Sequence, residues 1–153
     1  MTNLQPLSDK ELLEFRMLID GEMRKRGMSF SVGEIGEQIA LSHFNDTPGL
    51  STLAPAPKGT KNVDAISRSG DRYSIKTLWR AKKTGTVYPD VAQPDKQLFE
   101  YLIIVLLAQD YSLKAIYRFS WSQFISARSW DSRMNAWYIS SSARALNIGE
   151  KVA

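Results

Sequence analysis

An acid, a hydroxyl and an amine lie within one short stretch of the chain, Lys58–Arg80, which reads KGTKNVDAISRSGDRYSIKTLWR. Asp64 stands among small and apolar residues, and Ser74 and Lys76 follow it, two residues apart. Side chains two residues apart leave the same face of a strand. These are groups that bind ions and transfer protons, so the stretch is a candidate chemical site.

A β-hairpin is the element expected to position these groups. Two extended segments, 62–68 and 72–79, flank the turn-prone trio Ser69-Gly70-Asp71. With that trio as a three-residue loop, Asp64 is expected opposite Lys76 in the ladder, and the acid, hydroxyl and amine share one surface.

Two helices are expected before the hairpin. Ser8-Asp9-Lys10-Glu11 is a capping box, and apolar residues at helical spacing continue to about Lys25, before Gly27 as the C-terminal glycine. A second helix starts at Ser31, with Glu34 three residues later. Its expected buried stripe is Ile35, Ile39, Leu41 and Phe44. Glu34 and Glu37 project to similar sides: either Glu34 caps and Glu37 is solvated, or one of them points into a site.

The second half of the chain predicts more strands. Residues 45–61 read as an irregular loop, and Pro94 is expected to open a short helix, 95–100. The continuous apolar run 101–108 predicts a central strand, and 113–119 an amphipathic one. A helix from Ser120 to about Ala127 and a strand 136–140 follow. The expected order, α-α-β-β-α-β-β-α-β, implies an α/β fold with a mixed sheet and helices on its faces.

Composition excludes several classes of protein. The chain has 153 residues, a net charge of +4, no cysteine and one histidine, His43. Disulfides, thiolate zinc sites and a Ser-His relay are therefore not expected. The apolar run 101–108 is too short to cross a bilayer, and residues 1–10 lack the apolar region of a secretory signal. We expect no membrane association and a cytoplasmic setting; the positive charge mildly favours polyanionic partners.

Three features together resemble the PD-(D/E)xK nuclease superfamily, in its Ser-x-Lys variant. They are Glu37 on a helix, Asp64 at one strand, and Ser74-Ile75-Lys76 on the next strand. The resemblance covers residues 31–108. It implies a restriction-endonuclease-like fold: a mixed central sheet flanked by helices, in a single domain (1–153) with an N-terminal helical extension (about 1–28). The stretch 97–101, QLFEY, is also similar to the Gln-x-x-x-Tyr element of some RecB-like members.

The resemblance implies catalytic roles for Asp64, Glu37, Ser74 and Lys76, with Mg²⁺ or Mn²⁺ as the cofactor. Asp64 would be the central metal ligand, Glu37 a second, and the carbonyl of Ile75 a third, since hard cations prefer oxygen donors. Lys76 would orient the attacking water or stabilise developing negative charge. A divalent ion lowers the pKa of bound water and clamps the reacting oxygens.

Ser74 departs from the superfamily pattern, which has an acid at this position. Some restriction enzymes with Ser-x-Lys recruit a carboxylate from a nearby helix, and by that resemblance Glu100 or Glu34 would supply it. If neither reaches the site, we expect a lower metal affinity, which favours the alternative of a domain that does not cut.

Nucleic acid is the expected partner, DNA first and RNA as the alternative. Basic segments at either end of the hairpin suit phosphate contacts, and Trp79 beside them suits base stacking. The residues expected to contact nucleic acid are Lys58, Lys61, Arg80, Lys82, Lys83 and Gln97.

The leading function is therefore a metal-dependent endonuclease that hydrolyses phosphodiester bonds in DNA, with a homodimer suited to double-strand cleavage. The alternative is a catalytically inactive nuclease-like module that binds nucleic acid or a protein partner.

Overall fold

The computed structural model describes residues 3–153, so residues 1–2 of the expected domain and extension lie outside the described part. Its helices and strands, in chain order, are α1 (Asp9–Lys25), α2 (Val32–Asp46), β1 (Leu53–Pro55), β2 (Ala65–Ser67), β3 (Arg72–Leu78), β4 (Tyr101–Leu107), β5 (Leu113–Ser120), α3 (Trp121–Ala127), β6 (Ser129–Asp131), β7 (Ala136–Tyr138), α4 (Ala143–Leu146) and β8 (Glu150–Lys151).

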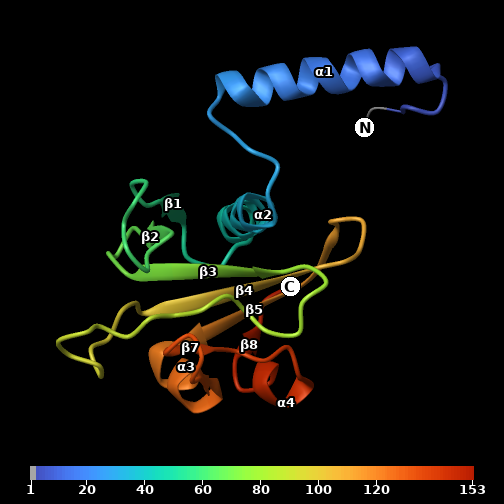
Figure 1. The fold of residues 1–153 in the computed structure, drawn as a ribbon. Helices are drawn as coiled ribbons and strands as arrows, with labels where there is room; N and C mark the ends of the chain where they lie inside the picture. The colour runs from blue at the N-terminus through green and yellow to red at the C-terminus, as the bar shows by residue number, and fades with distance from the viewer. Residues whose placement is uncertain (1–2) are drawn as a thin grey trace.

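A mixed six-stranded sheet, ordered β1-β2-β3-β4-β5-β8, forms the centre of the fold. Only β3 and β4 pair in parallel; the other neighbours are antiparallel. Figure 1 shows α2 on one side of this sheet, α3, α4 and β7 on the other, and α1 set apart from both. The described chain is thus mixed α/β, with four helices and a separate two-stranded β6–β7 ribbon.

Each face of the sheet has its own apolar core. On the α2 face, Tyr73 and Ile75 of β3 pack with Ala40 and Phe44 of the helix. On the opposite face, Leu78 of β3 packs with residues of β4, α3 and α4. Because strand side chains alternate, Ser74 and Lys76 point to the same face as Leu78.

The helix α2 lies close against β3 at Gly36. A Cβ at this position would come within 2.6 Å of Thr77 Cβ, so only glycine fits the observed spacing. The buried residues of α2 are Gly36, Ala40, Leu41 and Phe44. The expected stripe is therefore right for Leu41 and Phe44, while Ile35 and Ile39 are only partly buried against the same core.

The predicted helix over 95–100 is wrong. After a turn in which Lys96 N donates to Gln93 O, the chain runs extended into β4. Glu100 N bonds to Arg72 O and Phe99 is fully buried, so the segment continues the β3–β4 pairing. Strand pairing and burial of Phe99 outweigh the helix-opening preference of Pro94.

Most other expected elements are confirmed. Three helices begin at the expected serines: α1 at Ser8 and α3 at Ser120, each with a capping box, and α2 at Ser31, which caps it. The strands over 101–107, 113–120 and 136–138 match their predictions closely. The sequence did not predict β1, β6, α4 or β8; β1 contains Pro55, which is tolerated because β1 is an edge strand. Within residues 3–153, no helix has the length and apolar character needed to cross a membrane.

Candidate functional site

The β2–β3 hairpin differs from the predicted register by two residues. Ala65 lies opposite Tyr73 and Ile66 opposite Arg72, which places Asp64 beside Ser74 and not opposite Lys76. The three-residue loop is Arg68-Ser69-Gly70, one position earlier than expected. Gly70 has φ of +89°, and a loop of this length needs its left-handed residue last. The position of the turn is therefore set by its glycine, which is the last residue of the loop.

Asp64 uses its side chain to extend the hairpin. Oδ2 accepts a hydrogen bond of 2.7 Å from the backbone N–H of Ile75, and Asp64 N donates to Tyr73 O. Since β2 begins only at Ala65, the carboxylate takes the place of a strand partner for Ile75. The N–H and C=O of a strand residue point toward the same neighbour, so the Ile75 carbonyl faces the Asp64 side. Oδ1 makes no hydrogen bond with the described residues.

Glu37 comes to the same place from α2. Glu37 and Asp64 both line a cleft of about 400 Å³, whose other walls are the segment after α1 (26–28) and the loop 55–60. Burial raises the pKa of Glu37, and the neighbouring carboxylates Asp64 and Glu34 raise it further. Two carboxylates held together in this way bind a cation or a proton more readily than isolated ones.

Lys76 lies near Asp64 but does not line the cleft. Its Nζ donates to the backbone oxygen of Thr86 at 3.2 Å, on the opposite face of the sheet from α2. Burial lowers the pKa of Lys76, and the negative charge of Asp64 partly offsets that effect. Asp64 therefore acts electrostatically on both Glu37 and Lys76.

The two proposed substitutes for the acid missing at Ser74 are occupied elsewhere. Arg72 binds Glu100 through its backbone N–H (2.7 Å) and its guanidinium (3.0 Å), and this pairing lowers the pKa of the Glu100 carboxyl. Glu34 lines the cleft, but its Oε2 accepts the N–H of Ser29 at 2.7 Å. Ser74 itself is buried. Among residues 3–153, no three His, Asp or Glu side chains form a group that could hold a metal ion.

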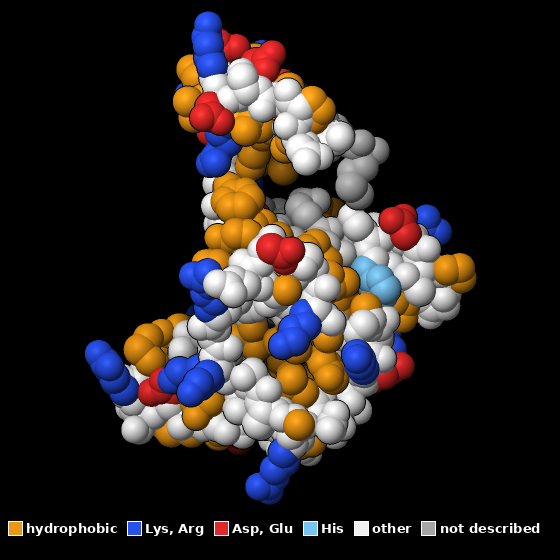
Figure 2. Space-filling view, turned by 90° about the vertical axis from the view of Figure 1, so that its right-hand side faces the viewer, with side chains coloured by type: hydrophobic (Ala, Val, Ile, Leu, Met, Phe, Trp, Pro, Cys, Tyr) orange, Lys and Arg blue, Asp and Glu red, His pale blue; other side chains and the backbone are white. Residues whose placement is uncertain are grey.

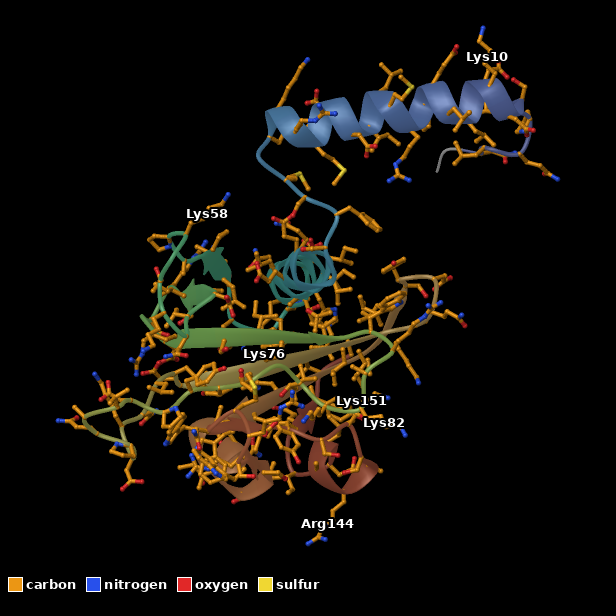
Figure 3. All side chains as sticks on the ribbon, viewed as in Figure 1. Lys10, Lys58, Lys76, Lys82, Arg144 and Lys151 are labelled. Carbon is orange, nitrogen blue, oxygen red and sulfur yellow. The ribbon has the colours of Figure 1, made fainter. Side chains whose placement is uncertain are left out.

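The basic residues expected to contact nucleic acid are not all on one side. In Figure 3, Lys58 and Lys82 lie at opposite ends of β3. Lys58 is exposed and lines the cleft with Glu37 and Asp64. Lys61 is exposed nearby in the same loop. Of the expected cations, Lys58 is the one that shares the cleft.

Two of the three expected cations after β3, Arg80 and Lys83, have partners of their own, whereas Lys82 is exposed. Lys83 Nζ pairs with Asp131 and lies 4.7 Å from the centre of the Tyr138 ring. Arg80 lies over one face of Trp79, and Tyr111 stacks on that ring at 4.7 Å. Both neighbours cover Trp79, so the suggestion that it stacks on bases is not supported.

The contacts of Gln97 and the residues that form the far wall of the cleft were the hardest features to predict from the sequence. The Gln97 amide donates to Phe99 O, within the extended segment and not on a helix. The sequence did not indicate that Arg26, Gly27 and Met28 would line the cleft. Their position depends on how the segment between α1 and α2 crosses the fold, for which no local pattern exists.

Comparison with known proteins does not identify a family. No family model matches the chain, and no curated protein was found to match it.

Proposed function

We propose that this chain is a metal-dependent nuclease that hydrolyses phosphodiester bonds in DNA, on the PD-(D/E)xK (restriction-endonuclease-like) plan. The observation that carries the proposal is the binding of Asp64 to the N–H of Ile75, in the middle of Ser74-Ile75-Lys76, beside Glu37 in one cleft. The resemblance implies this arrangement for the two acids and the Ile75 carbonyl; Lys76 lies outside the cleft and is linked to the acids through the charge of Asp64.

The donor set fits a hard divalent cation. Glu37, Asp64 and the Ile75 carbonyl offer oxygen atoms only, and Asp64 Oδ1 is free to bind. Mg²⁺ is commonly held by one or two carboxylates, with waters and substrate phosphate completing its shell, so a third acid is not required. When bound, such an ion would lower the pKa of a water and neutralise phosphate charge.

The side chains have separate tasks in this proposal. Asp64 and Glu37 hold the cation, and the bond to Ile75 fixes the orientation of Asp64. Lys76 supplies positive charge where negative charge develops on the phosphate. Lys58, on the rim of the cleft, contacts a flanking phosphate without reading sequence. The +4 net charge favours association with a polyanion.

A nuclease-like module that binds nucleic acid without cutting is the second candidate. Two observations favour it: Ser74 is only 3% exposed, and Lys76 Nζ donates to a backbone carbonyl on the far face of the sheet. In this case the cleft would hold phosphate groups through Lys58 and its neighbours.

The test is cleavage of plasmid, linear duplex, single-stranded DNA and RNA with Mg²⁺ or Mn²⁺, and with EDTA. The variants are Asp64→Asn, which keeps an acceptor for the Ile75 N–H, and Lys76→Met. Matched controls are Asp46→Asn at the exposed end of α2 and Lys114→Met on β5. We expect the first pair to lose at least about 100-fold in rate, a typical cost of removing one stabilising group, and the controls to keep it.

The outcomes separate the candidates. Metal-dependent cutting that is lost in Asp64→Asn and Lys76→Met supports the nuclease. Salt-sensitive DNA binding without cutting, on every substrate, supports the binding module. A chain that neither cuts nor binds contradicts both.

A further inference from the structure

The helix α1 carries an apolar stripe that nothing in the described chain buries. Leu12, Phe15, Ile19 and Met23 are three, four and four residues apart, which places them on one side of the helix. Leu12, Phe15 and Ile19 remain 37–43% exposed, and no residue of α1 is buried. Figure 2, in which α1 forms the top of the molecule, shows hydrophobic side chains on its surface.

A helix of this kind needs a partner surface. Its 17 residues are close to the shortest length that holds a helix in water without packing. Gly21, four residues before the end of the helix, lowers its helix propensity further. We therefore expect α1 to gain stability by packing its apolar stripe against another surface.

The charges of α1 indicate what that element is. The first turn carries Asp9 and Glu11, and the last turn Arg24 and Lys25. Two copies in antiparallel orientation place each acidic turn beside a basic one, with the helix dipoles opposed. A parallel pair would place like charges together. An anionic membrane surface fits poorly, because α1 contains five acids and four bases (Asp9, Glu11, Glu14, Asp20, Glu22; Lys10, Arg16, Arg24, Lys25).

We propose that α1 is a dimerisation helix that pairs with α1 of a second copy of this chain, antiparallel, across the stripe Leu12, Phe15, Ile19 and Met23. A two-fold axis near the middle of the helix makes the surface complementary to itself, as an isologous dimer requires. Phe15 of each copy then lies beside Ile19 of the other. This proposal concerns the assembly and does not depend on the proposed nuclease activity.

Sedimentation equilibrium of the full chain over a wide concentration range tests it. We expect a monomer–dimer equilibrium. Phe15→Gln with Ile19→Gln keeps helix propensity, removes no buried side chain within the chain, and should weaken the dimer by about 100-fold or more. The matched control is Leu13→Gln with Leu18→Gln, which removes apolar groups that are more exposed (67% and 71%, against 37% for Phe15 and 43% for Ile19) but lie off the stripe. It should leave the dimer unchanged.

A separate experiment tests whether the two α1 helices pair in antiparallel orientation. Arg24→Glu with Lys25→Glu should weaken an antiparallel dimer about tenfold at low salt, and less at about 0.5 M salt, where exposed charges are screened. Mixing that variant with Asp9→Lys/Glu11→Lys should restore association. Any of three results would overturn the proposal: a chain that stays monomeric, a dimer that tolerates the Phe15/Ile19 change, or a charge reversal that has no effect. Circular dichroism checks that every variant keeps its helices.

Discussion

Asp64 Oδ2 accepts the backbone hydrogen of Ile75 at 2.7 Å, so the carboxylate is bound to the middle residue of Ser74-Ile75-Lys76. This bond fixes the acid relative to the strand, and Oδ1 makes no hydrogen bond with the described residues. It forms because β2 starts at Ala65, two residues after Val63, the position that the register would place opposite Ile75. The end of a short strand thus becomes a place where an acid is held in position.

Replacing Glu37 with Gln should stabilise the protein while removing the proposed activity. Burial and the charge of Asp64 raise the pKa of Glu37 in the folded chain, so the folded state holds this proton more tightly than the unfolded state. The contribution of Glu37 to stability is complete below its unfolded pKa and is lost as pH rises through the folded value.

Thermal unfolding from pH 4 to pH 8 checks this expectation. Glu37→Gln should have a higher Tm than the wild type at pH 7–8, and the difference should vanish toward about pH 4, where ordinary glutamates protonate. Cleavage by the wild type should decline on acidification at a higher pH than an unshifted carboxyl would give. Glu14→Gln, in an exposed pair with Lys10 on α1, should show neither effect. An unchanged or lower Tm for Glu37→Gln at pH 8 would count against the cleft electrostatics.

Gly36→Ala should destabilise the chain by about 1–3 kcal/mol, the usual cost of overpacking. The added Cβ would overlap the side chain of Thr77 on β3, and α2 would have to move away from the sheet. Urea unfolding measures the change, and Thr77→Ala in the same chain should reduce it because the hydroxyl and methyl groups are gone. Gly33→Ala, with open space around it on the same helix, is the control and should not destabilise. Equal effects at the two glycines would contradict the close packing of α2 on β3.

Glu100→Gln should cost roughly 1 kcal/mol at pH 7, because the charge that faces Arg72 is lost in a half-exposed pair. Arg72 lowers the pKa of Glu100, so this stabilisation is present above the unfolded pKa and is lost as pH falls through the folded one. Denaturant unfolding at pH 7 and at about pH 3 should show the difference only at the higher pH. Glu22→Gln, in an exposed i,i+4 pair with Arg26, should cost no more than roughly 0.5 kcal/mol.

Local patterns predicted much of this fold. Caps at Ser8, Ser31 and Ser120 set three helix starts, and the apolar run 101–108 predicted the central strand, because both signals depend on neighbouring residues only. The helix expected over 95–100 failed because pairing with β3 decides that segment, and its sequence does not record the partner.

In the candidate site too, features set by neighbouring residues could be predicted, and features set by tertiary contacts could not. Asp64, Ser74 and Lys76 belong to one hairpin, so their proximity could be predicted, although the turn lies one residue earlier than expected, with Gly70 as the last residue of its loop. Glu37 was predictable from its helix. Other contacts depend on tertiary structure and could not be predicted from residue spacing. They are the pairing of Glu100 with Arg72, the pairing of Lys83 with Asp131, and the packing of Arg80 and Tyr111 on Trp79.

The connection between β3 and β4 has a kinetic consequence. The turn that joins β4 to β5 is short, so that pair can form early, whereas the parallel pairing of β3 with β4 must first close the long irregular segment 79–100. Asp64 and Lys76 both belong to the part of the chain that joins late. During refolding the β4–β5 pair would therefore form before the cleft does. The cleft residues would reach their final positions only when β3 pairs with β4.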